Sequence, residues 1–397
     1  MPEIISKKFQ EPPRTQMLNK LWQFQQERGY IDDDALKGLA TEFGISEIEV
    51  EGVISFYHFF HRKPTGKYTI YLNNSIVSEI KGFQRIMEAF ERETGATFGT
   101  VDRTGTFGLF LTPCIGLSDQ EPAALINFYP FTNLNAIKVK DIISRLKQGV
   151  LPESICDAPS DNIRYVPVED KSVFFRKYQT GQALSKMESL GPQGIIEEIK
   201  KSELAGRGGA FYPTWKKWEA TRQQPASQKF VVCNADEGEP GTFKDRVLMN
   251  SYAGSMIGGM IICGYAIGAT QGIIYLRGEY WWLKSKIEAA LQEFRVIGFL
   301  GKNICDIKGF DFNIRIQMGA GSYVCGEETA LLESLEGKRG EPRTKWYFPV
   351  ERGYLQYPTV INNVETFCAA ERIIEMGADA FRESGIPGSP GTKLISV

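Results

Sequence analysis

The N-terminal part of the chain carries apolar side chains at the spacing of amphipathic helices. The spacing predicts helices over Leu18 to Tyr30, Asp33 to Glu42 and Ser46 to Phe56. Asp32 and Ser46 stand where N-caps belong, and Gly44 stands where the second helix would end. We therefore expect a small helical bundle over residues 1–62.

After this bundle, short β-rich runs alternate with helical spacing. Strands are expected over Tyr68 to Leu72 and Phe107 to Leu111, and helices over 82–93 and 139–147. This order suits a thioredoxin-like sheet over residues 63–150. Residues 151–190 contain Pro152, Pro159 and Pro167 and show no sustained periodicity, so we expect a linker there.

From about residue 191, short apolar runs alternate with helical stretches. The apolar run Phe230 to Cys233 and the helical stretch Pro192 to Leu204 are examples. Alternation of this kind is typical of an α/β domain, in which helices cover both faces of a parallel sheet. We expect this domain to span residues 191–390.

The composition is that of an ordinary globular enzyme, with 42% hydrophobic residues and a formal net charge of -2. No basic cluster suits nucleic acid. The longest apolar run, residues 256–268, is too short and too rich in glycine to span a membrane. Because the N-terminus also lacks the apolar core of a signal peptide, we expect a cytoplasmic location.

The 7 cysteines are scattered singly along the chain. Their odd number and their spacing argue against a disulfide framework or a local metal site. Cys233, Cys263 and Cys325 lie in apolar surroundings, and we expect them to be small buried hydrophobic residues.

Three loops carry candidate chemistry, namely Gly206 to Ala210, Asn234 to Arg246 and Gly319 to Thr329. Glycines let backbone amides approach a phosphate or a flat ring, and the third loop opens a helix, whose N-terminus attracts anions. The acidic and amide groups of the second loop suit sugar-like hydroxyls or a nicotinamide. By itself, that loop is equally well explained as a solvated acidic turn closed by Pro240 and Gly241. Three such loops in order indicate a ligand site.

These loops resemble one protein family closely. The matching strings are Gly206 to Lys217 (in part), Asn234 to Arg246, Gly319 to Arg343 and Pro358 to Thr366. They are similar to the flavoprotein subunit that oxidises NADH in respiratory complex I and in soluble NAD-linked hydrogenases and formate dehydrogenases. Residues 15–150 resemble the thioredoxin-like small subunit of such complexes, on the strings Ser55 to Phe60, Gly66 to Tyr68 and Thr112 to Pro122. The fused order is most similar to the diaphorase subunit of the cytoplasmic NAD-reducing nickel-iron hydrogenase.

The resemblance implies a Rossmann-like domain that binds FMN and NAD(H). The residues expected to surround FMN are Gly206, Arg207, Gly208, Gly209, Lys217, Asn234, Asp236, Glu237, Gly238, Tyr323, Gly326, Glu327, Asn362 and Asn363. The residues expected on the dinucleotide side are Tyr212, Lys345 and Phe348, together with the candidate catalytic residues Glu239 and Glu328. The protein then needs only to align two rings and tune their charge, so no general base is required. The implied partners are an iron-sulfur electron-transfer subunit and hydrogenase subunits in a hetero-oligomer.

The chain departs from this family at its iron-sulfur sites. Where cluster-bearing small subunits place four cysteine ligands, alignment puts Asn73, Ser78, Cys114 and Ser118. One thiolate cannot hold that cluster, so we expect no 2Fe-2S centre and a purely structural thioredoxin-like domain. A β-grasp domain would begin at residues 391–397, and the family's 4Fe-4S site lies beyond it. That cluster is therefore expected only if the native chain continues past residue 397.

The chain also departs from the family in its nucleotide loop. The family string Gly-Phe-Pro-Thr-Gly-Leu-Lys-Trp reads Phe-Tyr-Pro-Thr-Trp-Lys-Lys-Trp over residues 211–218. Phe211 and Trp215 therefore replace two glycines, and their rings would either fill part of the pocket or stack on a base. We favour crowding. Trp346 and Tyr347 similarly replace prolines and add bulk near the expected adenine site.

The sequence therefore predicts an FMN-dependent NADH:acceptor oxidoreductase (diaphorase) subunit. One alternative is a non-catalytic or NAD-impaired flavoprotein scaffold. Another is the corresponding subunit of complex I or of an NAD-linked formate dehydrogenase.

Overall fold

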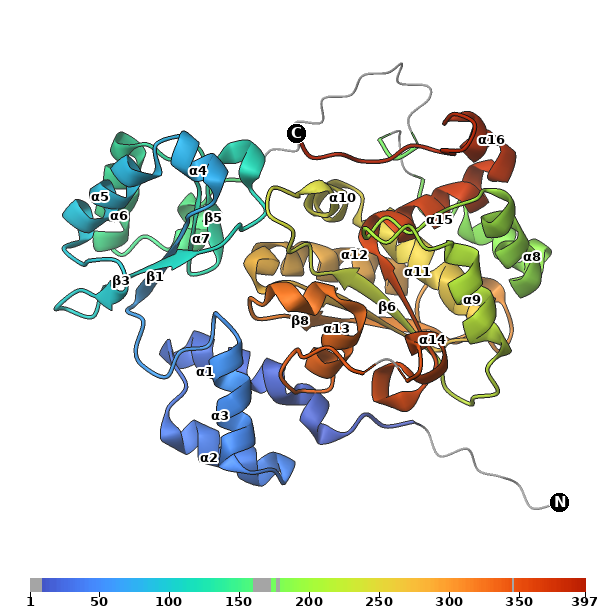
Figure 1. The fold of residues 1–397 in the computed structure, drawn as a ribbon, viewed down its shortest axis with the longest axis horizontal. Helices are drawn as coiled ribbons and strands as arrows, with labels where there is room; N and C mark the ends of the chain where they lie inside the picture. Colours follow the sequence, from blue (N-terminus) through green and yellow to red (C-terminus); the bar gives the residue numbers. More distant parts are fainter. Residues whose placement is uncertain (1–8, 160–172, 176–178, 345) are drawn as a thin grey trace.

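The computed structural model of the chain describes residues 9–159, 173–175, 179–344 and 346–397 (Figure 1). Its first helices are α1 (Met17–Arg28), α2 (Asp33–Phe43) and α3 (Glu47–Phe56). The Asp32 side chain accepts a hydrogen bond from the amide of Ala35, and Ser46 caps α3. Gly44 ends α2 with a φ of 63°. The predicted helices and caps are confirmed.

The thioredoxin-like part contains a five-stranded sheet in the order β2-β3-β1-β4-β5. The strands are β1 (Tyr68–Asn73), β2 (Thr100–Val101), β3 (Phe107–Thr112), β4 (Ala124–Ile126) and β5 (Tyr129–Phe131). The helices are α4 (Ile76–Ile80), α5 (Phe83–Thr94) and α6 (Ala136–Lys147). Only β1 and β3 pair in parallel. Apolar residues of α5, α6 and this sheet form a core of their own.

The second sheet is parallel throughout and has the order β8-β7-β6-β9. Its strands are β6 (Phe230–Ala235), β7 (Gln271–Leu276), β8 (Asn313–Met318) and β9 (Thr359–Asn363). In chain order, the strands run outward from β6 to β8, and β9 then returns to the other side of β6. Open parallel sheets bind ligands at such a reversal, beyond the carboxyl ends of the strands.

Helices surround this second sheet (Figure 1). They are α8 (Met187–Lys201), α9 (Thr214–Gln223), α10 (Lys244–Ser251), α11 (Ala253–Ile267), α12 (Lys284–Val296), α13 (Glu328–Leu335), α14 (Pro349–Arg352), α15 (Val364–Met376) and α16 (Ala378–Glu383). Helix α11 is buried on nearly every side and packs on α15, β6 and β7. Among the described helices, none alone is long and apolar enough to cross a bilayer. Only α10 and α11 together meet that criterion, and they are bent by 94°.

The described residues of the predicted linker over 151–190 include short helical elements. These are α7 (Pro152–Ile155), a 3-10 turn at Leu184–Lys186 and the start of α8. The part that holds Pro167 lies outside the described residues. The domain boundaries remain a prediction.

The N-terminal bundle shares its core with the second sheet, although β1 to β5 lie between them in the chain. Trp22 Nε1 donates to the carbonyl of Gly319 at 3.0 Å, and Tyr57 Oη donates to Ser334 Oγ at 2.7 Å. Trp22 and Tyr57 are buried, and their polar atoms therefore need hydrogen-bond partners inside the protein. The bundle is thus a wall of the α/β domain.

Candidate functional site

A cavity of about 490 Å³ lies where β6 and β9 end, at the reversal of strand order. Asn234 reaches it from β6, and Asn362 and Asn363 reach it from β9. The loops that begin at Gly206 and Gly326 complete the inner wall. The cavity therefore occupies the place where open parallel sheets bind ligands.

The glycines of these loops have a steric reason. A Cβ added at Gly208 would lie 3.3 Å from Asn363 Cβ, and one at Gly326 would lie 3.4 Å from the carbonyl oxygen of Asp236. A side chain at Gly208 would press on Asn363, and a side chain at either position would take up space in the cavity. The glycines thus keep the space between these loops open.

Most of the predicted site residues meet at this cavity. Those that line it are Gly206, Gly208, Tyr212, Lys217, Asn234, Gly326, Glu327, Glu328, Phe348, Asn362 and Asn363. Three others, Asp236, Gly238 and Tyr323, line a second cavity of about 460 Å³ beside the thioredoxin-like domain. Lys345 lies outside the described residues.

Four predicted residues, Arg207, Gly209, Glu237 and Glu239, line neither cavity. Gly209 has a φ of 111°, which a side chain would strain. Glu239 is exposed and accepts a hydrogen bond from Tyr323 Oη at 2.7 Å. The two candidate catalytic carboxylates, Glu239 and Glu328, therefore do not share one wall.

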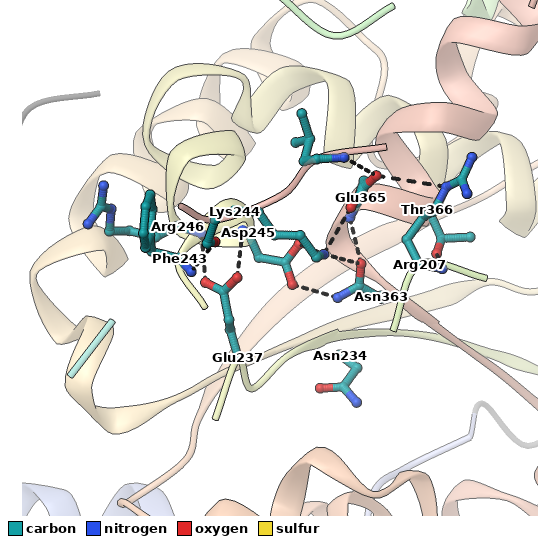
Figure 2. A network of polar contacts seen from close by, with 12 residues as sticks. Arg207, Asn234, Glu237, Phe243, Lys244, Asp245, Arg246, Asn363, Glu365 and Thr366 are labelled. Carbon is teal, nitrogen blue, oxygen red and sulfur yellow. Dashed lines mark hydrogen bonds and ion pairs between the residues drawn. The ribbon is translucent and has the colours of Figure 1, made fainter. Parts of the chain in front are cut away.

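Arg207 and Glu237 belong instead to a buried network of polar contacts (Figure 2). Lys244 Nζ lies 2.7 Å from Asp245 and 3.0 Å from Glu365, whose carboxylate also lies 3.8 Å from Arg207 Nε. Burial raises the pKa of Glu365, and the neighbouring Lys244 opposes that rise. The network fixes the backbone of the loops whose other face forms the cavity.

Glu237 holds the loop from Asn234 to Arg246, here called the acidic loop, in its folded form. Its carboxylate accepts hydrogen bonds from the amides of Asp245 and Arg246 and from Tyr280 Oη, at 2.8, 3.1 and 2.8 Å. Burial, with Asp245 close by, raises the pKa of Glu237 to about 7. Glu237 is therefore a scaffold of the loop in this structure.

Asp236 has a different environment. Burial raises its pKa to about 8, and its Oδ2 atom is enclosed without a hydrogen-bond partner among the described residues. An enclosed acceptor of this kind is costly unless a ligand or water satisfies it. Asp236 thus points to a ligand group that would complete the loop.

The carboxylates of the third loop are already engaged. Glu327 accepts hydrogen bonds from the amides of Thr329 and Ala330 and so caps α13. Glu328 pairs with Lys217 at 2.9 Å. Glu327 therefore serves as a helix cap and also lines the cavity.

The rings of Phe211 and Trp215 lie in different environments. Phe211 lines the cavity, is 57% exposed and has a φ of 51°, in the left-handed region that favours glycine. Trp215 lies in α9, packs on the core and carries Lys200 over its ring at 4.8 Å. The expectation that both rings crowd the pocket is therefore wrong for Trp215, since it does not line the cavity. Trp346 is exposed, and Arg352 covers the ring of Tyr347 at 3.9 Å.

A hydrogen-bonded network occupies the positions that align with the cluster ligands of the family. Asn73 Nδ2 and Ser78 Oγ donate to the buried carboxylate of Glu121 at 2.6 and 3.0 Å, and Ser75 Oγ also donates to it. Cys114 Sγ lies 3.5 Å from Ser118 Oγ. The polar side chains of this region thus hydrogen-bond to one another. The sequence did not predict this network, because Glu121 is not a ligand in the family pattern.

Two buried arginines, Arg246 and Arg277, bind the loop 113–120 of the thioredoxin-like part. Arg246 donates to both carboxylate oxygens of Asp119 at 2.8 and 3.0 Å and to the carbonyl of Gly116 at 2.9 Å. Arg277 donates to the carbonyl of Cys114 at 2.8 Å and pairs with Glu279. The loop that would hold a cluster is therefore held directly against the second sheet's domain.

Comparison with known proteins agrees with this architecture. Residues 199–372 match the Nuo51 FMN-binding domain, and residues 2–147 match the thioredoxin-like [2Fe-2S] ferredoxin family. The NAD-reducing hydrogenase HoxS subunit alpha of Cupriavidus necator is 52% identical over 97% of this chain and 66% of its own length. The chain belongs to the complex I-type FMN-binding flavoprotein family.

Further relatives of this flavoprotein agree with that assignment. A subunit of the NADH-quinone oxidoreductase of Aquifex aeolicus is 50% identical over 54% of this chain and 50% of that protein. A crystal structure of an air-oxidised NAD+-reducing [NiFe]-hydrogenase superposes with a TM-score of 0.84 at 35% identity. It covers 96% of this flavoprotein and 65% of that chain. The flavoprotein thus spans less than two thirds of the length of these relatives.

Sequence reasoning missed several parts of the flavoprotein's site. Thr366 Oγ1 accepts a hydrogen bond from the amide of Arg207 at 2.9 Å, and Thr366 also lines the cavity. Lys216, Ala220 and Val350 line its mouth. Thr366 could have been predicted, because it is the last residue of the matching string Pro358 to Thr366. Val350 could not, because it reaches the cavity through the packing of α14 on α9, which leaves no signal in the local sequence.

Proposed function

We propose that the chain is the FMN-binding, NADH-oxidising diaphorase subunit of a cytoplasmic, multi-subunit enzyme. It passes electrons between NAD(H) and iron-sulfur partners of a soluble hydrogenase. The observation that carries the proposal is the glycine-lined cavity at the reversal of strand order, with the enclosed Asp236 oxygen beside it. The similarity to an NAD-reducing hydrogenase and to an NADH-quinone oxidoreductase supports the same function.

Hydrogen bonds between protein groups orient several residues of the cavity. Asn234 Nδ2 donates to the carbonyl of Gly326 at 2.8 Å, and Trp218 Nε1 donates to Asn362 Oδ1 at 2.9 Å. Asn362 and Lys217, which line the cavity, would contact the flavin, and the glycines would admit its ring. When bound, FMN supplies two-electron exchange with the nicotinamide and one-electron exchange with clusters. The protein contributes alignment and exclusion of water, which is enough for such a transfer.

The first test is the flavin content of the purified chain and its response to NADH. We expect about one FMN per chain, bleached by NADH under anaerobic conditions. Asp236→Ala should weaken FMN binding by about 1–3 kcal/mol, because it removes an enclosed acceptor. Asp379→Ala, on the exposed start of α16, is the matched control and should retain FMN. A chain without flavin absorbance would contradict the proposal.

One observation favours a second candidate, a flavoprotein scaffold with impaired NAD binding. Phe211 stands in the cavity where the family has glycine. Flavin that remains oxidised in the presence of NADH would support the scaffold. Identification of co-purified subunits would separate a hydrogenase partner from complex I or a formate dehydrogenase.

We also propose that the thioredoxin-like domain binds no 2Fe-2S cluster. The proposal is supported by Asn73 and Ser78, which donate to Glu121 and supply no thiolate. After reconstitution with iron and sulfide, the full chain should hold no stoichiometric acid-labile sulfide. Cys114→Ala is the control, because it removes the one thiol that stands at the four aligned ligand positions. Sulfide that is present in the parent chain and lost in this variant would show a cluster after all.

A further inference from the structure

The mouth of the cavity carries a lysine that the family pattern does not have. Lys216 lines the cavity from α9, at the position where the family string reads leucine. Ala220, one helical turn later, and Pro349 and Val350 of α14 line the same part of the wall. The exposed rings of Tyr212 and Phe348 also border the cavity.

The charges of the lining residues are unequally engaged. Lys217 is neutralised by Glu328 at 2.9 Å and also donates to the carbonyl of Ile361. Glu327 is committed to the N-terminus of α13. Among the described lining residues, Lys216 is the cation without an ion pair. Its Nζ lies 5.7 Å from the ring centre of Trp215, a contact that leaves the ammonium accessible.

Resting on the function proposed above, we propose that Lys216 binds a phosphate group of the dinucleotide at the cavity mouth. A lysine ammonium is a mobile point charge that suits phosphate oxygens, and aromatic rings beside it suit an adenine. The phosphate comes either from the pyrophosphate that every such dinucleotide has or from the 2'-phosphate of the phosphorylated form. Lys216 is then a determinant of dinucleotide affinity that leucine-bearing relatives lack.

The test compares Lys216→Leu with Lys200→Leu in the full-length protein. Lys200 contacts the same indole ring at 4.8 Å but does not line the cavity, so its removal controls for loss of the cation–π contact. Dissociation constants are measured by calorimetry for adenosine, ADP-ribose and 2'-phospho-ADP-ribose. Lys216→Arg, which keeps the charge, should bind as the parent does.

We expect Lys216→Leu to weaken a phosphate-bearing probe about three- to tenfold and to leave adenosine unchanged. The effect should shrink at high salt, because the contact is solvent-exposed. An equal loss for both phosphate probes assigns the pyrophosphate, and a loss for the 2'-phosphorylated probe alone assigns the 2'-phosphate. Unchanged affinities in Lys216→Leu, or an equal loss in Lys200→Leu, would overturn the role of Lys216 and leave the proposed function standing. A parent protein that binds no probe at all would overturn the proposed function itself.

Discussion

Replacing Arg246 with alanine is expected to destabilise the protein by about 3–5 kcal/mol, because it breaks a buried ion pair from one side. The Arg246 side chain is fully buried, and its forked donors fit Asp119 and the carbonyl of Gly116. Loss of the guanidinium leaves these acceptors without their donors in the interface. The thermal midpoint should fall, and hydrogen exchange should accelerate in the loops 113–120 and 237–246.

A double-mutant cycle makes this prediction specific. If the pair is the source of the effect, Asp119→Ala should be costly too, and the double variant should lose less than the sum of the single variants. Arg145→Ala is the matched control, because Arg145 pairs with Asp141 along α6 and both side chains are more than half exposed. It should change stability by less than about 1 kcal/mol. Additive losses in the cycle would exclude the pair as the link between the loops.

Replacing Phe211 with glycine is expected to improve both stability and NADH binding. The left-handed backbone at Phe211 costs a non-glycine residue about 1–3 kcal/mol, and glycine removes that cost. The variant also removes a ring from the cavity, so the dinucleotide gains room beside the flavin. We expect NADH to bind up to about tenfold more tightly, which is about 1.4 kcal/mol. Stopped-flow reduction of the flavin by NADH measures both affinity and rate.

Trp215→Ala is the matched control for this variant, because Trp215 lies on α9 outside the cavity lining. Alanine keeps the helix, whereas glycine at this position would weaken it by about 1 kcal/mol. The control should leave NADH affinity unchanged. Weaker NADH binding in Phe211→Gly, by about 1–3 kcal/mol, would instead identify Phe211 as a ring that stacks on the dinucleotide.

The sequence predicted features whose causes are local. Ser46 and Gly44 are helix signals that act on neighbouring residues, and both perform the predicted roles. The loops at Gly206 and Gly326 could be recognised because a glycine string reflects a local steric need. Cys233, Cys263 and Cys325 are buried as their apolar neighbours indicated.

Features that depend on distant partners could not be predicted. Arg246 and Asp119 are 127 residues apart, and nothing in the sequence around either residue indicates that they form a pair. The different fates of Phe211 and Trp215 depend on where α9 begins and on how its outer face packs. Glu237 looked like a ligand residue because its hydrogen-bond donors, the amides of α10, become visible only after folding.

The shared core of the N-terminal helices and the second sheet has a consequence for biosynthesis. Trp22 and Tyr57 leave the ribosome long before Gly319 and Ser334, the residues that satisfy their polar groups. The core between α5, α6 and the thioredoxin-like sheet can pack in the interval, whereas Tyr71, Ile115 and Leu117 belong to the shared core and cannot. The apolar face of the nascent bundle stays uncovered until the second sheet has been made, so we expect these helices to be bound by chaperones during synthesis.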